Sequence, residues 1–134
     1  MGEPALILLD THVLVWLAVE PNRLSPAAAI SIRESRERGG VCISAITIWE
    51  MALLAKKGRV QVSGSLEAFV YDTIAPLVVK VMSPAICISA VSLPDEIPRD
   101  PADRLIAATS IVEALPLVTA DEKLRRSTLL QTIW

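Results

Sequence analysis

Four acidic residues could together bind divalent cations. Asp10 and Asp121 each follow a short apolar run, Glu50 interrupts an apolar helical stripe, and Asp103 opens an alanine-rich helix. If these carboxylates converge, they repel one another by several kcal/mol at a moderate dielectric, so a cation must hold them together. All four ligands are hard oxygens, which favours Mg²⁺ or Mn²⁺ over zinc. Such sites activate a water nucleophile for phosphodiester hydrolysis.

Each of these acids also has a purely structural explanation. Asp10 and Asp121 could cap the helices that follow them, and Asp100 is the expected N-cap of the helix that begins at the next residue. Glu50 could pair with a basic residue or reach water at a helix edge. Asp103 is stabilised by a helix N-terminus in any protein. The set of acids, rather than any single one, therefore predicts the site.

Strands and helices that alternate along the chain must position these acids. Short apolar runs predict strands at residues 5–9, 41–43, 78–82 and 116–119, and the tail predicts a fifth within 128–134. Serine, proline and aspartate starts predict helices at residues 12–19, 26–38, 45–57, 66–75, 84–93, 101–114 and 122–126. This alternation predicts an α/β fold with a parallel sheet covered on both faces. In such sheets ligands bind beyond the carboxyl ends of the strands, where Asp10 and Asp121 lie.

Length and composition limit the class of protein. The 134 residues suit a single domain over residues 1–134, and 52% apolar residues against 21% charged ones exclude a disordered chain. A mean hydropathy of +0.49 indicates that some apolar surface lies against another chain, so an oligomer is expected. The apolar stretches are too interrupted for a membrane span and the N-terminus has no export signal, which predicts a cytoplasmic protein.

Cysteine content and net charge add two expectations. Cys42 and Cys87 stand in apolar surroundings without a C-x-x-C pattern, so both are expected to be buried, reduced thiols. The net charge of -2 argues against a surface that binds nucleic acid through overall charge. If four of the 15 acidic groups surround cations, however, the remaining 11 face 13 positive groups, a balance of +2. RNA binding therefore stays open.

The acids lie within four short motifs that follow one another in a fixed order. They are LDTHVLVW at 9–16, SAITIWE at 44–50, DPADRLIAAT at 100–109 and LVTAD at 117–121. This ordered set resembles the PIN-domain family, and specifically the VapC-type toxins of bacterial toxin-antitoxin systems. The resemblance spans nearly the whole chain, although residues 60–94 carry no such motif.

The resemblance implies a fold, an activity and a set of partners. The fold is a three-layer α/β/α arrangement with a parallel five-stranded sheet in the order 3-2-1-4-5. The activity is that of an endoribonuclease dependent on Mg²⁺ or Mn²⁺, the toxin of a type II toxin-antitoxin system. The partners are an RNA substrate, a second copy in a homodimer, and a cognate antitoxin whose tail enters the active-site groove. The implied catalytic and metal-binding residues are Asp10, Glu50, Asp103 and Asp121, with support from Thr11 and Thr119. The position of Asp100, three residues before Asp103, makes it a candidate for a further supporting residue outside this set.

Several other side chains have open roles. Arg104 could orient a carboxylate or contact a phosphate, although an exposed arginine beside the acids is the expected case. Tryptophans 16, 49 and 134 are expected to pack in the core or at an interface rather than to stack bases. Six basic residues could hold a phosphate backbone or simply form solvated helix faces: Arg33, Arg36, Arg38, Lys56, Lys57 and Arg59.

Other functions fit the sequence less well. His12 is the only histidine, so a metal-free ribonuclease that uses two histidines is excluded, and attack by water predicts 5′-phosphate and 3′-hydroxyl ends. A phosphatase of the haloacid-dehalogenase type needs a second aspartate at the position of His12. A phosphorelay receiver domain needs an acidic cluster after the first strand and an aspartate after the third, and the chain has neither. The remaining alternative is a catalytically silent PIN scaffold that acts as a binding or regulatory module.

Overall fold

Strand β1 (Ile7–Leu9) is the middle strand of a five-stranded sheet in the computed structural model, which describes residues 6–134. Strands β2 (Val41–Ser44) and β4 (Leu117–Val118) flank it, and β3 (Val78–Lys80) and β5 (Thr132–Ile133) form the edges. Every neighbouring pair is parallel, and the order β3-β2-β1-β4-β5 confirms the predicted topology. The carboxyl ends of β1 and β4 thus lie side by side where the strand order reverses.

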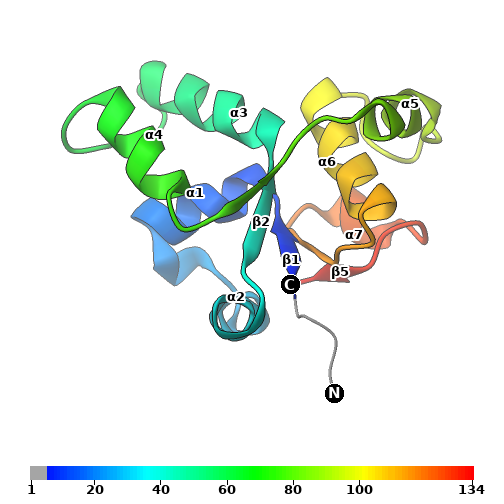
Figure 1. Ribbon diagram of the computed structural model, residues 1–134, viewed down its shortest axis with the longest axis horizontal. Helices are drawn as coiled ribbons and strands as arrows, with labels where there is room; N and C mark the ends of the chain where they lie inside the picture. Colours follow the sequence, from blue (N-terminus) through cyan, green and yellow to red (C-terminus); the bar gives the residue numbers. More distant parts are fainter. Residues whose placement is uncertain (1–5) are drawn as a thin grey trace.

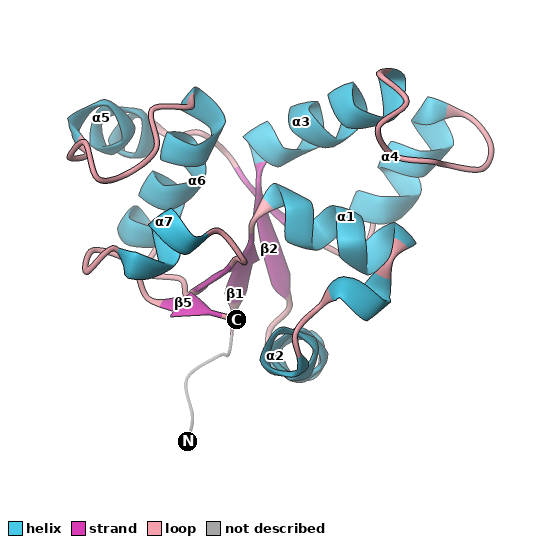
Figure 2. Ribbon diagram, turned by 180° about the vertical axis from the view of Figure 1, so that it is seen from behind, coloured by secondary structure: helices cyan, strands magenta, loops and turns pink. Residues whose placement is uncertain are grey.

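Helices cover both faces of this sheet (Figure 1). One group consists of α1 (Thr11–Val19), the 3-10 helix η1 (Pro21–Arg23), α2 (Pro26–Arg38), α3 (Ala45–Lys56) and α4 (Leu66–Ile74). The other group, on the opposite side in the reversed view of Figure 2, consists of α5 (Pro84–Ser92), α6 (Pro101–Val112) and α7 (Glu122–Arg126). The three-layer α/β/α architecture is therefore confirmed.

The uniformly apolar sequence of β1 follows from burial on both faces. Successive strand residues point to opposite sides of a sheet. Ile7 and Leu9 pack in one core cluster with side chains of α1 and α2, whereas Leu8 packs in a second cluster that contains Ile106 of α6 and Leu124 of α7. An alternating polar pattern would place polar groups in one of these two cores, so the strand contains none.

Most helices begin and end where the local sequence predicts. The hydroxyls of Ser25, Ser44 and Ser65 accept hydrogen bonds from backbone amides of the first turns of α2, α3 and α4, at 3.1, 3.3 and 3.0 Å. Gly58 follows α3 with a φ of +73°, a conformation that glycine adopts without steric cost. Two details differ from the predictions: η1 was not predicted, and β3 and β4 are shorter than their apolar runs. Only residues 78–80 of the β3 run pair with β2, whereas the backbone groups of Pro116 and Thr119, on either side of β4, still form hydrogen bonds with the neighbouring strands.

The prediction for the cysteines is half correct. Both thiols are free and Cys42 is buried in β2, where loss of solvation raises its pKa. Cys87 is exposed. It lies one residue after the buried Ile86 of α5, and a rotation of about 100° per residue turns it away from the core.

Exposed apolar side chains gather on β3, on the segment that follows it and on α5. They are Val78, Val79, Val81, Met82, Ile88 and Val91, the last of which is 81% exposed. We call these six residues the β3–α5 patch. Exposed apolar side chains of this number are typical of surfaces that bind another molecule. None of the helices within residues 6–134 has the length and apolar character needed to cross a bilayer.

Candidate active site

Asp10 lies directly after β1 and is almost completely buried, with 4% of its surface exposed. Its Oδ1 accepts a hydrogen bond from the backbone amide of Thr11 at 2.9 Å and so caps α1. Its Oδ2 accepts a bond from the hydroxyl of Thr119 at 2.6 Å, and Nδ1 of His12 lies 3.5 Å from the same oxygen. Asp10 is thus held in one orientation at the carboxyl end of the central strand.

Thr119 connects the two strand ends that meet at the reversal of strand order. Its hydroxyl donates to Asp10 and accepts from the backbone amide of Asp121 at 3.1 Å. The residue is fully buried at the end of β4. One threonine therefore positions the backbone of Asp121 relative to the carboxylate of Asp10.

Glu50 enters the site from the middle of α3. The hydroxyl of Thr11 donates to its Oε1 at 2.5 Å, and Thr47 lies 2.9 Å from Thr11 in a hydroxyl-to-hydroxyl bond. Since Thr11 uses its only proton on Glu50, Thr47 must donate to Thr11. Burial raises the pKa of Glu50; the bond from Thr11 partly opposes this, and the charges of Asp10 and Asp100 add to the increase.

Asp103 has the most strongly perturbed carboxyl group of the site. It lies in the first turn of α6 and is half-buried. Burial, the largest cause, and the charges of four further carboxylates together raise its pKa from 3.8 to about 7; these carboxylates are Asp10, Asp100, Glu50 and Asp121. The charges of the other four acids therefore all reach Asp103, although the five residues come from four separate parts of the chain.

Asp100 and Asp121 also act as helix caps, as the structural explanation of each predicted. Oδ1 of Asp100 accepts from the amides of Ala102 and Asp103 at 2.8 and 3.2 Å, and Asp100 itself is exposed. Oδ1 of Asp121 accepts from the amides of the second and third residues of α7 at 2.8 and 3.3 Å. Each cap uses one carboxylate oxygen, so capping leaves the second oxygen of each group for other ligands.

Two residues of the site were not singled out by the sequence. Thr47 supports Thr11, and its place three residues before Glu50 on the same helix face was a usable signal. His12 accepts a hydrogen bond at Nε2 from the backbone amide of Ala120 at 3.0 Å. Because Nε2 is the acceptor, the proton of the neutral ring lies on Nδ1, which faces Asp10.

The expectation that Arg104 is an exposed residue beside the acids is wrong. The side chain is half-buried and turns away from the carboxylates. Its guanidinium donates to the backbone carbonyls of Ala90, Leu93, Ile97 and Pro98. Since the five donors of a guanidinium can serve several acceptors at once, Arg104 fastens α5 and the following loop to the start of α6.

The donor chemistry of the site fits a divalent cation. Carboxylate oxygens are the ligands that Mg²⁺ and Mn²⁺ prefer, and a bound cation would oppose the increase in pKa that neighbouring carboxylates cause at Glu50 and Asp103. Within residues 6–134 no three acidic, histidine or cysteine side chains already form a group at ligand distance. The match between this site and a divalent cation therefore rests on the oxygen donors of the carboxylates and on the repulsion between their charges.

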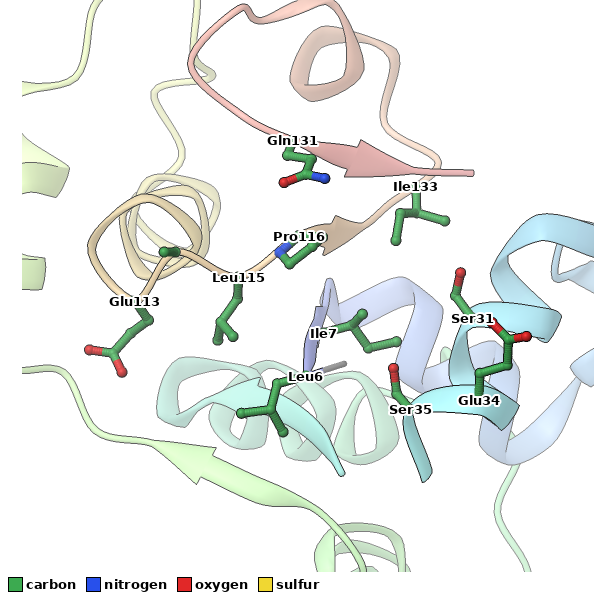
Figure 3. Close-up of a pocket in the computed structure, with 11 residues that line it drawn as sticks. Leu6, Ile7, Ser31, Glu34, Ser35, Glu113, Leu115, Pro116, Gln131 and Ile133 are labelled. Carbon is green, nitrogen blue, oxygen red and sulfur yellow. The ribbon is translucent and has the colours of Figure 1, made fainter. Parts of the chain in front are cut away.

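A cavity outside the candidate site lies at the opposite edge of the sheet. It has a volume of about 630 Å³ and is lined by residues at the amino-terminal ends of β1, β4 and β5, including Ile7, Pro116 and Gln131. Its two acidic lining residues, Glu34 and Glu113, lie on opposite sides (Figure 3). Glu113 is paired with Lys80 at 3.3 Å. Because this cavity contains none of the five acids, it is not the candidate active site.

Known proteins with related sequences and folds identify the family of the chain. A ribonuclease VapC22 from Mycobacterium tuberculosis is 38% identical over 119 residues, which cover 89% of each chain. The solved structure of VapBC2 from Rickettsia felis bound to a DNA fragment from their promoter has a TM-score of 0.73 at 18% identity, with 95% of this chain and 96% of that one covered. A toxin-antitoxin complex from Klebsiella pneumoniae has a TM-score of 0.65 at 21% identity, with 92% and 94% covered. The family model of the PIN domain matches residues 7–128. The chain belongs to the PIN-domain family.

Proposed function

We propose that this single PIN domain is an endoribonuclease that depends on Mg²⁺ or Mn²⁺ and acts as the toxin of a type II toxin-antitoxin system. The observation that carries the proposal is the carboxyl group of Asp103, whose pKa is raised to about 7 by burial and by four neighbouring carboxylates. A cation would remove this repulsion. The identity of 38% to a protein named a ribonuclease supports cleavage of RNA.

Asp10, Glu50, Asp103 and Asp121 are the residues that would hold the ion. When bound, a divalent cation supplies an activated water and neutralises charge that develops on the phosphodiester. The side chains around the site keep the acids in place: Thr119 orients Asp10 at 2.6 Å, and Thr11, backed by Thr47, orients Glu50 at 2.5 Å. Asp100, at the start of α6, adds negative charge that strengthens attraction for the cation.

The proposal includes two protein partners. The Klebsiella structure is described as a toxin-antitoxin complex, which supports an antitoxin as the natural inhibitor of this chain. The exposed β3–α5 patch supports a homodimer, because a second chain that covered these apolar side chains would remove them from water.

Cleavage of RNA tests the proposal. The purified chain, free of any partner, is incubated with a mixture of transfer and ribosomal RNA in Mg²⁺ or Mn²⁺, and the ends of the products are mapped. We expect cuts that EDTA prevents, that Asp10→Asn abolishes, and that leave 5′-phosphate and 3′-hydroxyl ends. The matched control is Asp72→Asn, which changes an exposed aspartate of α4 and should leave cleavage unchanged.

Two results would contradict the proposal. Ends that carry a 2′,3′-cyclic phosphate would show attack by the 2′-hydroxyl instead of water. If no RNA is cut and calorimetry also detects no binding of Mg²⁺ or Mn²⁺, the chain is a catalytically silent scaffold that serves as a binding or regulatory module.

A further inference from the structure

A cavity beside the acidic site has the features of a subsite for one nucleotide. It has a volume of about 310 Å³ and lies between α1 and the segment that follows α3. His12 lines this cavity and at the same time lies 3.5 Å from Asp10, so the cavity opens next to the acids. Val15, Leu54 and Val60 form an apolar wall. Its volume is at the lower end of the range for small-molecule sites, roughly 300 to 1,000 Å³.

Two arginines give the cavity its positive charge. Arg23 and Arg59 both line it and both are exposed. Within residues 6–134 neither arginine forms an ion pair with a carboxylate; the basic and acidic side chains in contact there are His12 with Asp10 and Lys80 with Glu113. One acid, Glu20, also lines the cavity, which leaves a net charge of one positive unit.

Stacking on an aromatic ring orients the guanidinium of Arg23 so that it can bind an anion. It stacks on the ring of Trp16 with its central carbon 4.3 Å from the ring centroid. The indole is itself fixed, because the rings of His12 and Trp134 contact it at centroid distances of 4.9 and 5.8 Å. A stacked arginine keeps its N–H donors free at the rim of the ring, where they can bind a phosphate in a fixed direction.

The negative charge of the acidic site explains why RNA binding requires a basic cavity beside it. The five carboxylates attract a cation but repel the phosphates on either side of the one that is cut. An RNA strand that reaches Asp10 must therefore gain its affinity from basic groups beyond the acids. The cavity at His12 offers these groups at one side of the site.

We infer that this cavity binds the RNA nucleotide next to the scissile phosphate, with its own phosphate on Arg23 and Arg59 and its base against the apolar wall. The inference rests on the proposed ribonuclease function and adds a place that selects and orients the substrate. Arg23 and Arg59 would then contribute to binding of RNA and leave the chemical step to the carboxylates.

Binding and cleavage measured side by side test this inference. The binding probe is a fluorescein-labelled single-stranded RNA of 12 nucleotides and mixed sequence, titrated in EDTA at several salt concentrations. Cleavage of the transfer and ribosomal RNA mixture is measured in Mn²⁺. The variants are Arg23→Gln and Arg59→Gln, and the matched control is Arg33→Gln, an exposed arginine on α2, the helix that borders the cavity at the opposite edge.

Each of the two substitutions should weaken binding by about three- to tenfold and lower the salt slope by about 0.7, the value for one lost phosphate contact on a single strand. The kcat/KM for cleavage should decrease because KM rises, while kcat stays near that of the parent chain. Arg33→Gln should match the parent. Arg59→Gln keeps the contact between Arg23 and Trp16, so its effect cannot come from loss of that stack.

The outcomes separate this inference from the function on which it rests. If the parent chain binds and cuts RNA while both variants match Arg33→Gln, the subsite is wrong and the ribonuclease stands. If the parent neither binds nor cuts RNA, both are wrong. A loss of kcat without a change in affinity or salt slope would also overturn the subsite, because it would place the arginines in the chemical step.

Discussion

Replacement of Asp103 by asparagine should stabilise the metal-free protein at neutral pH. The substitution preserves the shape of the side chain but removes a negative charge that burial and four carboxylates oppose. A raised pKa means that the unfolded chain loses this proton at lower pH than the folded chain does. The parent therefore loses stability as pH rises from about 4 to about 7, and the asparagine variant avoids this loss.

The size of the effect follows from the pKa of Asp103. At about 1.4 kcal/mol per pKa unit, the change from 3.8 to about 7 sets an upper bound of about 4 kcal/mol. Asp103 is only half-buried, so solvent screens part of the repulsion. We expect Asp103→Asn to raise the free energy of unfolding by about 1 to 2 kcal/mol at pH 8, with an advantage near zero at pH 4.

Urea denaturation in EDTA, followed by tryptophan fluorescence at pH values from 4 to 8, measures this difference. Asp72→Asn serves as the control, because an exposed aspartate should change stability by less than about 0.5 kcal/mol. Saturating Mn²⁺ should reverse the order, since the parent then gains a ligand that the variant lacks. The reasoning is refuted if Asp103→Asn is no more stable than the parent at pH 8 in EDTA, or if its advantage shrinks as pH rises.

Three other predictions follow from the contacts of single side chains. Thr119→Val should lower the free energy of unfolding, measured in urea, by about 1 to 3 kcal/mol, because it removes the hydroxyl that donates to Asp10. Thr119→Ser keeps a hydroxyl and should retain the stability of the parent, whereas a Thr119→Val variant as stable as the parent would show that this hydrogen bond does not stabilise the fold. Arg104→Met should lower the free energy of unfolding by roughly 2 to 3 kcal/mol, because it leaves the backbone carbonyls of α5 and the following loop without their donor. A decrease of less than about 0.5 kcal/mol in the same assay would show that these hydrogen bonds are dispensable. Val91→Lys places a charge in the β3–α5 patch and should convert the proposed dimer to a monomer in light scattering, whereas an unchanged mass would locate the interface elsewhere.

Much of the fold could be predicted from the sequence because local rules decide it. The apolar residues 5–9 have no polar face, which is the pattern of a strand covered on both sides. Ser25, Ser44 and Ser65 belong to a residue type that favours the N-cap position, and each of them caps the helix that follows it. The extent of β3 could not be predicted in this way. Pairing with β2 decides it, and an apolar run alone carries no information on where that pairing stops.

The residues of the site could likewise be predicted where the local sequence marks them, but not where contacts with distant parts of the chain decide their role. The acids were recognisable because carboxylates rarely follow or interrupt apolar runs, as Asp10 and Glu50 do. The side chain of Arg104 was misjudged because its four acceptors are backbone carbonyls, which every residue has and which no pattern marks. The bond from Ala120 to His12 escaped notice for the same reason, since it joins a backbone amide to a residue 108 positions away.

Binding of Mn²⁺ measured by calorimetry tests most directly whether the acids form one cation site. The parent chain is compared with four single variants, Asp10→Asn, Glu50→Gln, Asp103→Asn and Asp121→Asn, and with Asp72→Asn as the control. We predict that each of the four weakens Mn²⁺ binding by at least about tenfold, which corresponds to about 1.4 kcal/mol, while the control binds as the parent does. Binding that is unchanged in all four variants would contradict the shared site and, with it, the proposed metal-dependent ribonuclease.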